Sequence, residues 1–158
     1  MTPQEILDQL RANFGEAILE SKLDAPQPWI SVAPNRTKDI CFFLRDTASL
    51  QFDYLMCLSS VDNKDKQLSV VYHVWSTTQK HKIVLKAFCP RDNAHIQSVS
   101  SVWGTADWHE REAFDMMGIV FDEHPDLRRI LCPDDYPGNP LRKDFKVPEF
   151  YQGIKVPY

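Results

Sequence analysis

Charged residues gather in one short stretch of the chain, where Glu110-Arg111-Glu112 is followed by Asp115. Neighbouring carboxylates of this kind can transfer protons in acid–base catalysis, provided that a cleft holds a substrate beside them. Nothing in the sequence indicates such a cleft. A structural network of salt bridges and an interface with another protein explain the stretch equally well, and acid–base catalysis ranks third.

This stretch falls in a helix that is expected to begin after the capping residue Thr105 and to end at Gly118. Helical spacing places Glu110 on the apolar face of that helix. The same face carries Ala106, Ala113, Phe114 and Met117. A carboxylate on this face needs a cationic partner, because an unpaired buried charge strongly destabilises a fold.

Several arginines can supply the missing charge. Arg111 can form ion pairs one helical turn away, with Asp107 or Asp115. Arg128 and Arg129 are the other nearby cations.

Motifs for several other chemistries are missing. His109-Glu110 begins like the zinc motif H-E-x-x-H, but Ala113 stands where the second histidine is required. The sequence has five glycines and none of the glycine-rich patterns that bind phosphates. The cysteines are widely spaced and are expected to be reduced, mostly as small core residues: Cys41, Cys57, Cys89 and Cys132.

Composition narrows the function further. The 158 residues carry a net charge of −4, which disfavours a protein that binds nucleic acid. The longest apolar run, residues 40–44, is far shorter than the ~18 residues that span a bilayer. The first residues have neither the basic nor the apolar part of a signal peptide. We therefore expect a cytoplasmic chain without a membrane span.

The expected elements give the fold class. Apolar residues at helical spacing predict helices over 3–14 and about 37–46. Runs rich in β-branched and aromatic residues, separated by polar turns such as 62–66, predict strands over 29–32, 52–58, 68–75 and 82–88. The sequence therefore predicts a two-layer α+β domain, with a mostly antiparallel sheet and helices on one face.

The chain after residue 121 differs in composition from the rest. Six of the eleven prolines lie within 125–158, so neither a helix nor a strand period can persist there. Aromatic residues are spread among them: Tyr136, Phe145, Phe150, Tyr151 and Tyr158. We expect a domain over 1–121 and an extended tail over 122–158. The tail either folds back on its own domain or, as we favour, straps onto another protein, in which case it is mobile from about 133 in the free chain.

The stretch from Glu110 to Leu131 resembles the signature of the C subunit of NADH-quinone oxidoreductase, the thirty-kilodalton subunit family of respiratory complex I. That signature joins E-R-E to an acid with two apolar residues, then to a histidine, a basic residue and two apolar residues. The fixed positions are met at 110–112, 115–117, 124, 128, 130 and 131.

The resemblance continues on both sides of this signature. Further matches are Ser98-Val99, Trp103, Ala106 and Trp108 before E-R-E, Pro140-Leu141-Arg142-Lys143-Asp144-Phe145 after it, and Ser60-Val61-Asp62 and Val71-Tyr72 in the strand region. The first 50 residues are similar only in length and general pattern.

The resemblance implies a non-catalytic, cofactor-free subunit in the peripheral arm of a proton-translocating NADH- or ferredoxin-dependent quinone oxidoreductase. Such a subunit sits on the cytoplasmic side of the membrane and supports the quinone-reducing module. Its implied partners are the D subunit and the iron–sulfur subunits, which together with other subunits hold the iron–sulfur clusters, flavin and quinone. The implied interface or ion-pair residues are Glu110, Arg111, Glu112, Asp115, His124, Arg128, Arg129, Arg142, Lys143 and Asp144.

Two other interpretations stay open. The same kind of subunit serves membrane-bound hydrogenase-type complexes, and the sequence does not distinguish the electron donor. A stand-alone enzyme that uses the carboxylates of 110–115 is the alternative from another class.

Overall fold

The computed structural model describes residues 1–63 and 67–156. Part of the expected polar turn 62–66, and the last aromatic residue of the expected tail, Tyr158, therefore lie outside the described residues.

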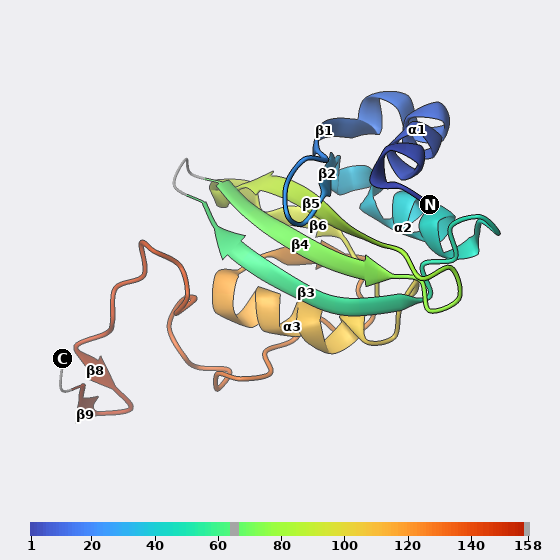
Figure 1. The fold of residues 1–158 in the computed structure, drawn as a ribbon. Helices are drawn as coiled ribbons and strands as arrows, with labels where there is room; N and C mark the ends of the chain where they lie inside the picture. Colours follow the sequence, from blue (N-terminus) through green and yellow to red (C-terminus); the bar gives the residue numbers. More distant parts are fainter. Residues whose placement is uncertain (64–66, 157–158) are drawn as a thin grey trace.

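A five-stranded sheet forms one layer of the protein (Figure 1). Its strands are β1 (Ile18–Lys22), β2 (Trp29–Val32), β3 (Tyr54–Asp62), β4 (Gln67–Trp75) and β5 (Lys82–Pro90). They lie in the order β1-β2-β5-β4-β3, and all neighbours are antiparallel except the parallel pair β2 and β5. The predicted antiparallel hairpins of the middle region are confirmed.

In the described residues, three α-helices accompany the sheet: α1 (Pro3–Phe14), α2 (Thr37–Asp46) and α3 (Ala106–Met117). The predicted bounds of the first two are confirmed. Thr2 caps α1 by accepting a hydrogen bond from the Glu5 backbone N–H, while the Glu5 side chain accepts one from the Thr2 N–H. Thr105 stands at the N-cap position of α3, as expected, but its side chain forms no capping hydrogen bond.

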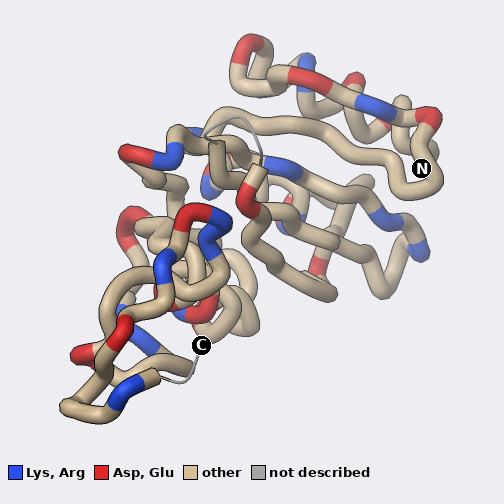
Figure 2. The backbone as a smooth tube through the Cα atoms, turned by 90° about the vertical axis from the view of Figure 1, so that its left-hand side faces the viewer, with Lys and Arg blue, Asp and Glu red and all other residues tan. Residues whose placement is uncertain are grey.

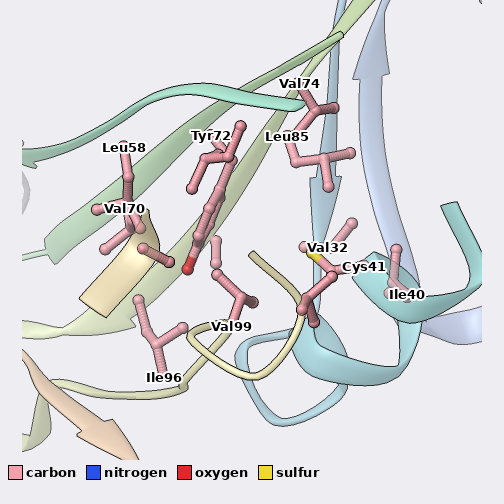
Figure 3. Close-up of a cluster of buried hydrophobic side chains, with 14 of the residues drawn as sticks. Val32, Ile40, Cys41, Leu58, Val70, Tyr72, Val74, Leu85, Ile96 and Val99 are labelled. Carbon is pink, nitrogen blue, oxygen red and sulfur yellow. The ribbon is translucent and has the colours of Figure 1, made fainter. Parts of the chain in front are cut away.

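The helices cover one face of the sheet, so the predicted two-layer α+β class is confirmed. Along β4, Leu68, Val70, Tyr72 and Val74 are buried, while Val71, His73 and Trp75 are only partly covered. This alternation follows from the two-residue period of a strand. The buried side chains of β4 join those of the helices in one core, part of which is drawn in Figure 3.

A second, two-stranded sheet fixes both ends of α3. Strand β6 (His95–Gln97) precedes the helix and β7 (Val120–Asp122) follows it, and the two strands pair in parallel. Ile96 and Phe121 bury their side chains in the common core. The expected division of the chain after residue 121 therefore falls within β7.

Beyond β7 the chain follows α3 and then leaves the body of the protein (Figure 1). Its last described part is a short hairpin of β8 (Phe150–Tyr151) and β9 (Ile154–Lys155). No helix in the described residues is long and apolar enough to cross a membrane.

Candidate functional site

Glu110 lies on the buried side of α3, as its helical position predicts, with no exposed surface. It binds the connection between β6 and α3 rather than a cation. Ser98 Oγ donates a hydrogen bond to one carboxylate oxygen at 2.6 Å, and the Val99 backbone N–H donates to the other at 2.7 Å. Burial raises the pKa of Glu110 to about 7, more than these two hydrogen bonds lower it.

His124 closes the same buried cluster from the segment after β7. Its Nδ1 accepts a hydrogen bond from the Asp126 backbone N–H at 3.0 Å, which places the proton of a neutral ring on Nε2. That nitrogen donates to the Asp107 carbonyl oxygen at 3.3 Å and lies 3.8 Å from Glu110 Oε2. The histidine of the signature therefore holds the chain against the first turns of α3.

Asp115 is the second buried carboxylate of α3. It accepts hydrogen bonds from the backbone N–H groups of Ile130, Leu131 and Cys132 at 2.7–3.1 Å. Arg129 Nη1 donates to it at 2.8 Å. Burial alone would raise the pKa of Asp115, but these four donors outweigh burial and hold the pKa below its ordinary value.

The arginines are paired differently from the expectation. Arg111 forms no ion pair with Asp107 or Asp115; its guanidinium donates to the carbonyl oxygens of Arg128 and Arg129, each at 3.3 Å. Arg128 pairs on the surface with Asp126, whereas Arg129 reaches a buried carboxylate, Asp115 instead of Glu110. Glu110 therefore has no arginine partner, because Ser98 and Val99 already occupy both of its oxygens.

The chain after residue 138 caps the C-terminal end of α3. Arg142 Nε donates to the Met117 carbonyl oxygen at 2.6 Å, and Asn139 Nδ2 donates to the Asp115 carbonyl oxygen at 2.9 Å. Gly118 ends the helix with φ +68°, and a Cβ there would lie 2.6 Å from Asn139 Oδ1. The predicted stop at Gly118 is confirmed, and glycine also leaves room for the returning chain.

A second set of contacts ties the same segment to the sheet. The Lys143 backbone N–H donates to Asp62 Oδ2 at 2.8 Å, and Asp62 also pairs with Arg91. Arg91 Nη1 lies 3.2 Å from Asp144. Lys143 thus contributes its backbone, whereas its side chain is exposed.

The outer side of α3 carries exposed apolar residues. Trp108, Leu131 and Leu141 are 66%, 63% and 56% exposed. Two hollows of about 350 and 300 Å³ lie between them; His109 and Glu112 line both. Glu112 forms no ion pair or hydrogen bond with another described side chain. We call this surface, made of Trp108, His109, Glu112, Leu131 and Leu141, the outer α3 face.

The three carboxylates of the signature have different surroundings. Glu110 and Asp115 are each enclosed by donors of this chain, and Glu112 points outward. Among the described residues no three His, Cys, Asp or Glu side chains are grouped to hold a metal ion. Figure 2 shows both charge signs interspersed along the backbone. The arrangement can join parts of the chain and present a surface to another protein.

Comparison with known proteins finds a family that matches the region around α3. Residues 30–151 match the family described as "Respiratory-chain NADH dehydrogenase, 30 Kd subunit". The chain belongs to this family. The match runs from β2 to β8 and includes Glu110, Asp115, His124, Arg129 and Arg142 with the partners given above.

Curated relatives support the assignment. The C subunit of NADH-quinone oxidoreductase from Chloroherpeton thalassium is 50% identical over 94% of this chain and 63% of the relative. That of Chlorobium phaeobacteroides is 47% identical over 96% of this chain and 93% of the relative. This chain therefore spans less than two thirds of the first relative's length and nearly all of the second's.

Solved structures share the fold. The trypsin-resistant fragment of Nqo5 superposes with a TM-score of 0.65 at 22% identity, over 80% of this chain and all of the fragment. A chain of the membrane-bound sulfane sulfur reductase, an archaeal respiratory membrane complex, superposes with a TM-score of 0.73 at 21% identity. It covers 92% of this chain and 86% of that one.

Proposed function

We propose that the chain is a non-catalytic structural subunit, without cofactors of its own, in the peripheral arm of an ion-translocating quinone oxidoreductase. The observation that carries this proposal is the use of the signature's charges. Hydrogen bonds within the chain engage the side chains of Glu110, Asp115 and Arg129. These side chains therefore leave no acid–base pair free for a substrate. What remains available is an exposed apolar face.

The signature builds a rigid support for that face. The buried carboxylates of Glu110 and Asp115 hold the chain on both sides of α3, and Arg142 caps its end. Side chains locked in this way present their neighbours in a fixed geometry, which favours binding because less conformational freedom is lost. Trp108 is stacked by Arg111, whose guanidinium carbon lies 5.6 Å from the ring centroid.

Its partners in this proposal are the D subunit and the iron–sulfur subunits, which carry the clusters near the quinone. The relatives are named as subunits of NADH-quinone oxidoreductases, and this supports the choice. We place the chain on the cytoplasmic side of the membrane, held there through its partners.

The strap function applies to the end of the chain. Residues 128–145 are bonded to α3 and to Asp62, so they belong with the folded body. The hairpin of β8 and β9 extends beyond it, with Phe150 and Ile154 58% and 72% exposed. We propose that this hairpin is the part that reaches a neighbouring subunit.

Affinity isolation of the tagged chain from detergent-solubilised membranes, followed by mass spectrometry, tests the proposal. We expect the D subunit and the iron–sulfur subunits in stoichiometric amounts. Co-isolated nucleotide- and flavin-binding subunits would identify NADH as the donor, and their absence would indicate ferredoxin or a hydrogenase-type complex. Recovery of the chain alone, with substrate turnover of its own, would contradict the structural role.

A further inference from the structure

Strand β3 forms one edge of the five-stranded sheet and has β4 as its only neighbour among the described strands. Natural edge strands usually avoid further pairing by being short or by carrying lysine or proline. β3 has nine residues and contains neither, and Tyr54, Met56 and Val61 are exposed along it. A slight irregularity between Leu55 and Cys57 leaves the longer part, 57–62, regular.

The hydrogen-bond phase shows which backbone groups of β3 are free. The Asn63 N–H donates to the Gln67 carbonyl oxygen, so Asn63 and Gln67 form a hydrogen-bonded pair. Hydrogen-bonded pairs alternate with non-bonded pairs along an antiparallel ladder. From the register, the backbone N–H and C=O groups of Cys57, Ser59 and Val61 therefore bond to β4. The N–H and C=O groups of Leu58 and Ser60 point away from β4.

A groove of about 350 Å³ lies between β3 and α3. Leu58 and Ser60 line it on the strand side, and Glu112 and Met116 line it on the helix side. Leu141 lies at the groove as well, where the Leu141 N–H bonds the Met116 carbonyl oxygen. The groove thus offers unpaired backbone, an apolar wall and one carboxylate that has no ion pair in the described chain.

We propose that the β3 edge receives an extended segment of a partner subunit, which adds a sixth strand through Leu58 and Ser60 and places a Lys or Arg against Glu112. The segment presents small apolar side chains toward Met116 and Leu141. This proposal rests on the structural role proposed above and names how one partner is held.

A second copy of the chain fits this edge less well. Residues 54–62 contain no lysine or arginine, so a β3 strand from another copy brings no cation to Glu112. Charge complementarity therefore points to a different chain.

Residue-resolved hydrogen exchange of the free chain and of the intact complex tests the proposal. In the complex, the amides of Leu58 and Ser60 should exchange at least tenfold more slowly than in the free chain. The amides of Cys57 and Ser59 should be protected in both, because they are bonded to β4. The slowing of exchange on assembly should therefore appear at every second residue. This pattern distinguishes an added strand from side chains that merely cover the surface.

Three outcomes would overturn the proposal. Unchanged exchange at Leu58 and Ser60 in an assembled complex would reject the added strand while leaving the structural role intact. An equal increase in protection at every residue of 57–61 on assembly would indicate surface covering alone. Protection of Leu58 and Ser60 in the free chain that rises with its concentration would identify a second copy as the occupant.

A pair of variants supplies an independent test. Ser60→Pro removes an N–H that β4 does not use, and we expect at least tenfold less chain retained in the complex. Ser60→Ala keeps the N–H and should be retained normally. Circular dichroism and thermal unfolding of both variants confirm that the fold is kept. Equal retention of two folded variants would contradict the proposal.

Discussion

Arg129 Nη1 lies 2.8 Å from Asp115 Oδ1, and this ion pair joins the buried side of α3 to the segment that follows β7. The carboxylate is fully buried, whereas the arginine side chain is 19% exposed. Three backbone N–H groups complete the environment of Asp115. One carboxylate therefore organises the whole turn 129–132, and with it the position of Leu131 on the outer α3 face.

Replacing Arg129 should unfold this turn. Arg129→Glu sets a second carboxylate beside buried Asp115, and we expect a loss of about 3 kcal/mol in the free energy of unfolding. Urea denaturation followed by circular dichroism measures it. Arg128→Glu is the matched control, because its partner Asp126 is exposed, and the loss should stay below about 1 kcal/mol. Equal losses in the two variants would contradict the role given to Asp115.

In cells, Arg129→Glu should lower incorporation of neighbouring subunits and quinone reductase activity together, and normal assembly on a native gel would count against this.

Glu110 should make stability depend on pH. Burial raises its pKa from 4.5 to about 7 in the folded chain, so the folded state binds the proton more tightly than the unfolded state. The stabilisation is fully present below pH 4.5 and is lost as pH rises through about 7. This difference in pKa corresponds to roughly 3 kcal/mol.

Glu110→Gln does not titrate, so it isolates this effect. We expect the free energy of unfolding of the native chain, relative to Glu110→Gln, to fall steadily between pH 5 and 7, about the interval given by that pKa shift. Urea denaturation at several pH values measures the two curves. Parallel curves over this range would show that Glu110 is ionised throughout, and would contradict the effect of burial.

Arg142 and Lys143 are neighbours with different expected effects. Arg142→Ala removes the hydrogen bond to the Met117 carbonyl oxygen at the end of α3, which should cost about 1–2 kcal/mol. Lys143→Ala removes an exposed side chain and keeps the backbone N–H that binds Asp62, so it should cost less than about 0.5 kcal/mol. Thermal unfolding of both variants checks the order, and a reversed order would show that the cap contributes little.

Limited proteolysis should cleave the end of the tail before it cleaves the part that is bonded to α3. Within residues 123–156, trypsin should cut first after the exposed Lys146 and Lys155. Arg129 and Arg142 are bonded to α3 and should be cut much later. Mass spectrometry of the fragments measures the order. Early cleavage after Arg142 would instead support the expectation that the chain is mobile from about 133.

Local patterns were sufficient for much of the fold. The glycine stop at Gly118 depends on neighbouring residues and was predictable. The parallel pairing of β2 with β5, and of β6 with β7, was not, because it joins segments that are far apart in the chain. The short strand β6 has only three residues, too few to show a period.

The candidate site divides in the same way. Helical spacing predicted that Glu110 faces the apolar side of α3, since it shares a face with Ala106 and Ala113, but not that it is buried. It could not predict that Ser98 and Val99 would take the place of a cation, because hydrogen-bond donors from a preceding loop have no sequence period. Arg91 was missed for a similar reason: its partner Asp62 lies 29 positions away.

In the proposed function, the outer α3 face serves assembly rather than chemistry. Leu131→Glu places a charge on that face, while Leu19→Glu does so at a comparably exposed position on β1. Native gels stained for quinone reductase activity measure both the amount of complex and the activity per assembled complex. We predict at least fivefold less complex with Leu131→Glu, unchanged activity per complex, and normal assembly with Leu19→Glu. A normal amount of complex whose activity is lost with Leu131→Glu would contradict the assembly role of this face.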